Sequence, residues 1–183
     1  MEIWQKDSHE KDNYFSCETR RGREFIIRLT TGADPVLAIA KFAKENNIMY
    51  GKVHSPFMGA FRKTRYLMWV PNLENPEEWH SETIAENNHL SSICALGGMI
   101  GRRPTLEGGD ESFVAMHFVA GASWDSATFG GHLEVGTEVA GTFQVFVTEL
   151  LDIEALKPVD LYNEEYTWPQ NWYQNIKGVK ENE

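Results

Sequence analysis

The residues best suited to chemistry are two histidines in separate apolar segments. His117 lies within segment 113–119, and His132 directly follows the glycine pair Gly130-Gly131. Glycine permits a bend and a close backbone approach, so adjacent antiparallel strands would bring both imidazoles within reach of one zinc-type ion. A zinc site normally has three or four protein ligands. The pair therefore indicates either part of a metal site or two hydrogen-bonded strand histidines.

The sequence carries no other strong catalytic signature. It has no Gly-x-Ser-x-Gly nucleophile elbow and no phosphate-binding Gly-x-x-x-x-Gly-Lys loop, and segment 97–101 lacks the spacing of a dinucleotide fingerprint. Glu134 and Glu138 flank the turn after His132, and one of them is a candidate general base. Acidic residues in so acidic a chain are usually solvated. We therefore assign no catalytic residue, and whether the protein is an enzyme stays open.

The composition indicates a globular domain with an acidic surface. The chain has 183 residues, of which 42% are hydrophobic, and its formal net charge is −10. That charge repels a phosphate backbone, so direct binding of nucleic acid is doubtful. The N-terminus lacks the apolar stretch of a signal peptide, and the longest uncharged stretch, 87–101, is too short to span a bilayer. We expect a cytoplasmic protein that does not contact membranes, with Cys94 buried as a small apolar side chain.

The elements expected to position the histidines form a single α+β domain with a largely antiparallel sheet. One main helix is predicted over about 34–46, because Asp34-Pro35 is a typical helix start and apolar residues then recur at helical spacing. The polar, acidic connection 71–89 is long, so it is either a functional loop, with 75–79 as one possible helical turn, or it carries further structure. The predicted strands cover residues 24–29, 49–55, 61–70, 90–96, 113–120, 127–135 and 142–151.

The chain divides into three parts on composition. Residues 1–23 are expected to form a polar N-terminal arm, residues 24–152 the domain, and residues 153–183 an aromatic-rich extension. The extension holds most of its aromatic residues between 158 and 173 without helical or strand periodicity. A segment of this kind typically wraps its own core or a neighbouring subunit.

Several segments between residues 24 and 151 resemble, in order and spacing, the plants-and-prokaryotes-conserved (PPC) domain family. They are Arg28-Leu29 with Gly32 and Pro35, Met58-Gly59-Ala60, Ile93 to Gly98, His117 with Gly130-Gly131-His132-Leu133, and Thr142 to Val147. The resemblance implies a compact α+β domain that assembles as a homotrimer. Plant members follow AT-hook segments and mediate assembly and contacts with other regulators. Prokaryotic members stand alone, often under a DNA-binding label.

The same resemblance implies where a site would lie. Some members hold a metal through a His-x-His pair and the histidine of Gly-Gly-His, which places ligands at His117 and His132. This chain departs from that pattern, because Ala115 replaces the first histidine of the pair, and Ser92 and Gln144 stand where the family often has glutamate. A third metal ligand would have to come from His54, His80 or His89. The residues expected to line the cleft are Ala115, Gly130, Gly131, Ser92 and Gln144.

The function implied by these observations is a stand-alone trimeric module that binds a small ligand or a protein partner beside His117 and His132. A zinc-type divalent metal is its candidate cofactor. The alternatives are a metal-dependent enzyme of unknown reaction and a DNA-binding protein. Segment 20–23, Arg-Arg-Gly-Arg, contains the Arg-Gly-Arg core of an AT-hook, but Glu24 follows where the hook has proline. The pattern favours a solvated basic turn. The other basic residues, Arg62, Lys63, Arg65 and Arg102-Arg103, are interpreted as exposed or as members of ion pairs between subunits.

Overall fold

The computed structural model describes residues 17–55, 59–71, 79–105, 109–122, 128–155 and 173–175. The chain forms two compact units, one of Arg23–Glu149 and one that combines Met1–Gly22 with Leu150–Glu183. Within the described parts, no helix has the length and apolar character needed to cross a membrane. Residues 1–16 of the expected arm and most of the aromatic segment 158–173 lie outside the described residues.

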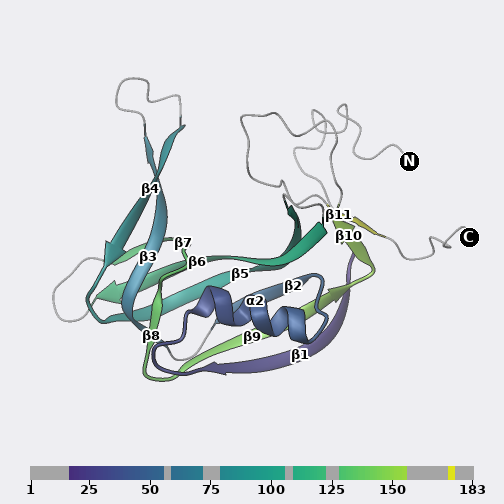
Figure 1. The fold of residues 1–183 in the computed structure, drawn as a ribbon, viewed down its shortest axis with the longest axis horizontal. Coiled ribbons are helices and arrows are strands. Elements are labelled where there is room, and N and C mark those ends of the chain that lie inside the picture. The colour runs from purple at the N-terminus through teal and green to yellow at the C-terminus, as the bar shows by residue number, and fades with distance from the viewer. Residues whose placement is uncertain are drawn as a thin grey trace, which may run out of the picture. The chain divides into compact units, whose positions relative to one another are not determined.

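A large, mainly antiparallel sheet makes up most of the first unit, which confirms the predicted α+β class (Figure 1). Its strands follow the order β1-β9-β2-β5-β6-β7-β3-β4, and β8 pairs with β3. A separate antiparallel pair, β10 (Ile153–Ala155) with β11 (Tyr173–Asn175), belongs to the second unit. The strands of the large sheet are β1 (Arg20–Leu29), β2 (Gly51–Ser55), β3 (Ala60–Pro71), β4 (Trp79–Asn87), β5 (Ser91–Thr105), β6 (Gly109–Ala122), β7 (Phe129–Leu133), β8 (Glu138–Ala140) and β9 (Phe143–Leu151).

Helix α2 (Pro35–Glu45) confirms the helix predicted over about 34–46. Asp34 is its N-cap, and one carboxylate oxygen accepts hydrogen bonds from the backbone N–H groups of Val36 and Leu37 at 2.9 and 3.1 Å. These bonds satisfy N–H groups that have no partner within the helix. The second oxygen of Asp34 accepts the N–H of Gly136 at 2.7 Å. The helix start is thereby tied to the turn that follows β7.

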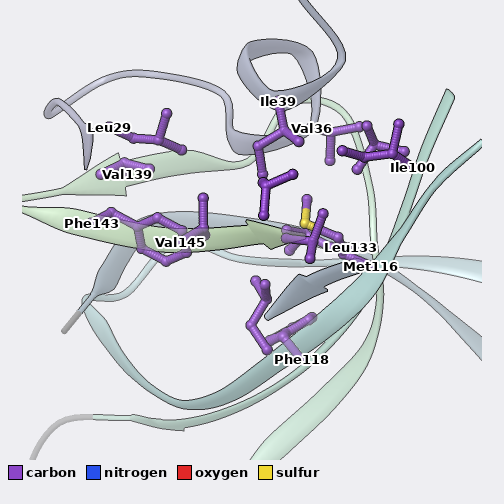
Figure 2. Close-up of a cluster of buried hydrophobic side chains, with 14 of the residues drawn as sticks. Leu29, Val36, Ile39, Ile100, Met116, Phe118, Leu133, Val139, Phe143 and Val145 are labelled. Carbon is purple, nitrogen blue, oxygen red and sulfur yellow. The ribbon is translucent and has the colours of Figure 1, made fainter. Parts of the chain in front are cut away.

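The hydrophobic core lies between α2 and one face of the sheet, which we call the inner face. Ile39 and Val36 point from the helix toward the side chains of the strands (Figure 2). Phe61 and Phe143 are fully buried and stack with ring centroids 5.5 Å apart. Alternate residues of β6 (Val114, Met116, Phe118 and Ala120) are buried in the same core. Residues 115, 117 and 119 must therefore point to the opposite, outer face of the sheet.

Of the two alternatives for segment 71–89, the functional loop is wrong, because β4 occupies Trp79–Asn87 and pairs with β3. The expected strand ends at Gly97-Gly98 are also wrong, because β5 runs through both glycines. A Cβ at Gly98 would overlap the carbonyl oxygen of Ala115, so this glycine permits close approach of β6 and does not end a strand.

Cys94 is exposed, which contradicts its predicted burial. The pairing of β5 with β6 shifts register here, since Ile93 lies opposite Ala120 and Ala95 lies opposite Val119. Cys94 is thus the extra residue of a β-bulge, and a bulge leaves one residue outside the regular alternation of the strand. The apolar flanks of Cys94 correctly indicated a strand but could not show the bulge.

Candidate functional site

The two predicted histidines lie directly opposite each other on β6 and β7. Nδ1 of His132 is 3.3 Å from Nε2 of His117. The ring centroids are 5.0 Å apart, and the ring planes meet at 84°. Fifteen residues of chain separate the pair, so antiparallel register alone brings the rings together.

The glycine pair explains how β7 fits between its neighbours. A Cβ at Gly130 would overlap the carbonyl oxygen of Phe118 in β6. A Cβ at Gly131 would lie 2.7 Å from the carbonyl oxygen of Leu67 in β3, which is closer than real Cβ contacts. His132 pairs on one side with His117 and on the other with Leu67. The Gly-Gly-His sequence therefore holds the imidazole of His132 in a tightly packed strand.

Glu134 lies beside the second ring nitrogen of His132. Its Oε1 is 3.9 Å from Nε2 of His132, and both side chains are mostly buried, with exposed fractions of 15% for His132 and 27% for Glu134. The backbone N–H of Glu134 donates to the carbonyl of Arg65 at 2.8 Å, and its carbonyl accepts from the hydroxyl of Thr137 at 2.9 Å. The second candidate base, Glu138, instead forms an ion pair with Arg62.

A third histidine shares the row of residues that crosses the outer face. His54 on β2 lies opposite Gly97 on β5, and Gly97 lies opposite His117. The ring of His54 stacks on Phe146 of β9, with centroids 5.5 Å apart and planes at 15°. Among the described residues, no three His, Cys, Asp or Glu side chains gather closely enough to hold a metal ion. His89 is exposed after β4, and the side chain of His80 lies outside the described set.

The remaining residues of the predicted cleft divide into two groups. Ala115 lies on the outer face beside His117, opposite Met99. Ser92 lies opposite Gly121, four residues further along β6 than His117. Gln144 lies on β9, and β2 and β5 separate that strand from β6. The structure therefore gathers His117, His132, Ala115, Gly130 and Gly131, but it does not bring Ser92 or Gln144 to the pair.

Most of the basic residues considered for DNA contact have acidic partners within the chain. Arg20 pairs with Asp152 at 2.8 Å, and Arg62 pairs with Glu138. Lys63 and Arg65 both approach Glu86, at 3.5 and 3.8 Å. Segment 20–23 is part of β1 and not a free arm. The positive charge of these paired basic residues is therefore balanced by nearby carboxylates, which does not favour a surface that binds a DNA groove.

Arg23 makes a denser set of contacts. Its side chain donates to both carboxylate oxygens of Glu149 at 2.8 Å and to the carbonyl of Asn46 at 2.8 Å. Its backbone N–H also donates to Glu149. The hydrogen bonds from Arg23 hold the pKa of the Glu149 carboxyl below its ordinary value. Arg23 thus joins β1 to β9 and is not available as the second arginine of an AT-hook.

Comparison with known proteins identifies a family and a fold. The model of the Plants and Prokaryotes Conserved (PCC) domain matches residues 17–151. No curated protein matches at a significant level. A metal-containing protein from Archaeoglobus fulgidus has 23% identity and a TM-score of 0.58, covering 75% of this chain and 86% of that one. A plant- and prokaryote-conserved protein from Pyrococcus horikoshii has 20% identity and a TM-score of 0.58, covering 75% and 85%.

A third similar structure comes from Bacteroides thetaiotaomicron and is named as a candidate for DNA binding. It has 19% identity and a TM-score of 0.55, covering 75% of this chain and 89% of that one. At these identities the likeness establishes the fold alone.

Proposed function

The chain belongs to the Plants and Prokaryotes Conserved domain family, and from that membership we propose that it acts as a self-assembling binding module. In this proposal His117 and His132 hold a zinc-type divalent ion on the outer face of the sheet. The observation that carries the proposal is the 3.3 Å separation of Nδ1 of His132 from Nε2 of His117.

This separation suits two nitrogens that share one ion. Zinc binds histidine nitrogen at about 2.0–2.1 Å with tetrahedral geometry, which places two ligand nitrogens about 3.3 Å apart. A direct hydrogen bond between the two rings fits the same distance. Titration with zinc distinguishes a shared ion from this hydrogen bond. A bound ion would supply a Lewis acid with open positions for donors from a small ligand or a protein partner. Because Ala115 offers no ligand, the described part of the chain contributes these two imidazoles.

We expect substitution of His132 by alanine to weaken zinc binding strongly. Wild-type protein, purified without a histidine tag and freed of metal, should bind about one equivalent of zinc per chain. The His132→Ala variant should bind more than about tenfold more weakly, because one imidazole alone cannot hold the ion. Isothermal titration calorimetry measures both affinities, and cobalt absorbance reports the number of ligands.

His89→Ala is the matched control for this titration, because His89 is exposed and, among the described residues, does not join the pair in a cluster that could hold a metal ion. Its affinity should stay within about twofold of wild type. Less than about a tenth of an equivalent of zinc on wild-type protein, unchanged in His132→Ala, would overturn the metal proposal.

Self-assembly is supported by the apolar character of the outer face. Helix α2 covers the inner face, whereas Ala95, Gly97 and Val119 are exposed on the outer one. An antiparallel sheet that leaves small and apolar residues in water is a typical subunit interface. The family resemblance implies three copies, and we propose that this face is buried between them.

Light scattering at micromolar concentration should therefore give a mass of three chains of 20.9 kDa. A charge in the interface would be desolvated without a partner, so Val119→Glu should shift the protein toward monomer. Val135→Glu is the control, because Val135 has nearly the same exposure, 43% against 42%, but lies in the turn after β7. A monomeric wild-type protein would contradict the proposal.

A further inference from the structure

We propose that Glu134 sets the tautomer of His132, so that the ring nitrogen facing His117 carries a lone pair. Glu134 is thus a positioning residue for the histidine pair. The tautomer follows from the geometry of the metal-free chain, whereas its effect on metal affinity rests on the proposed function.

The argument begins with the two nitrogens of His132. A neutral imidazole has one N–H and one lone pair, and its neighbours decide which nitrogen carries the hydrogen. Nδ1 faces His117, and Nε2 faces the carboxylate of Glu134 at 3.9 Å. That distance is too long for a hydrogen bond. The negative charge of Glu134 still acts strongly on the imidazole, because both side chains are mostly buried and water screens the interaction little. The carboxylate attracts an N–H and repels a lone pair, so it favours the hydrogen on Nε2.

The position of Glu134 is set by the fold and not by a flexible surface loop. Its backbone is held by hydrogen bonds to Arg65 and to Thr137, and Thr137 is fully buried. Asp34, the cap of α2, binds Gly136 in the same turn. These contacts hold the backbone of the turn, and the Glu134 side chain extends from it to place its carboxylate on the side of Nε2.

The consequence concerns the nitrogen that faces His117. With the hydrogen on Nε2, Nδ1 of His132 can accept the N–H of His117 across the 3.3 Å contact. An ion between the two rings also requires a lone pair on Nδ1 of His132. Glu134 therefore prepares the ring for both partners, as a carboxylate does for a metal-binding histidine in other sites.

The test measures the tautomer directly by ¹⁵N NMR of histidine-labelled, metal-free protein, since protonated and unprotonated ring nitrogens have well-separated chemical shifts. His132, assigned from the spectrum of His132→Ala, should carry its hydrogen on Nε2 in wild type. In Glu134→Gln, which keeps the shape but removes the charge, the form with hydrogen on Nδ1 should appear. Glu138→Gln is the matched control, because Glu138 pairs with Arg62, and it should leave the tautomer unchanged.

Zinc titration then tests the consequence for binding. Glu134→Gln should weaken zinc about tenfold, the effect expected of a lost carboxylate partner, whereas Glu138→Gln should have none. A wild-type His132 with its hydrogen on Nδ1, or a tautomer unaffected by Glu134→Gln, would overturn the inference even if zinc binds. Absence of zinc binding with the expected tautomers would overturn the metal proposal and leave the role of Glu134 in place.

Discussion

Replacement of Gly130 by alanine is expected to separate the two histidines and weaken zinc binding at the pair. The added Cβ would overlap the carbonyl oxygen of Phe118, so β7 must move away from β6. This displacement should weaken zinc more than about tenfold and destabilise the fold by about 1–3 kcal/mol, the usual cost of overpacking. Calorimetric titration measures the first effect, and urea unfolding measures the second.

Gly97→Ala is the control for this substitution. Gly97 lies opposite His117 in the same row of the outer face, but a Cβ there would meet only the carbonyl oxygen of Val53, at an ordinary 3.9 Å. We expect zinc affinity within about twofold of wild type, because a Cβ at Gly97 displaces no atom of its own chain. Unchanged affinity in Gly130→Ala would show that close approach of β6 and β7 does not position the pair.

The Phe143→Ala substitution is expected to lower the free energy of unfolding by about 3–5 kcal/mol. Phe143 is fully buried, stacks on Phe61, and fills the space directly beneath Gly59. Truncation removes the apolar contacts of the ring and leaves a cavity that the surrounding strands can close only in part. Urea unfolding followed by circular dichroism measures the difference in free energy.

Ile26→Ala provides the comparison for Phe143→Ala. Ile26 lies on β1 with an exposed fraction of 67%, so its removal should change the unfolding free energy by less than about 0.5 kcal/mol. A loss below about 1 kcal/mol for Phe143→Ala would mean that this ring is not part of a closely packed core.

The helix and most strands were predictable because local rules act on short segments. Asp34 and Pro35 indicated the start of α2 through capping, which depends on nearby residues alone. The strand β4 was missed because its segment is polar and acidic, and pairing with β3 stabilises it more than its own composition does. A glycine can end a strand or permit close packing, and the sequence does not distinguish the two, so the passage of β5 through Gly97 and Gly98 was not predictable.

The candidate site was predictable only in part. The spacing of His117 and the Gly-Gly-His motif correctly indicated adjacent strands with facing rings. The approach of Glu134 to His132 depends on hydrogen bonds of the Glu134 backbone with the carbonyl of Arg65 and the hydroxyl of Thr137, and Arg65 lies far away in the sequence. The separation of Gln144 from the pair depends on strand order, which local patterns do not determine.

The cross-strand origin of the histidine pair determines which length changes the protein can tolerate. The pair depends on the alignment of Phe129–Leu133 with β6, and not on the number of residues between the two strands. One extra amino acid within β7 itself would instead reverse the alternation and turn the imidazole of His132 toward Met116 and the apolar interior. Among homologues we therefore expect insertions and deletions between the two strands and not within β7, where they would change which face of the sheet each side chain occupies.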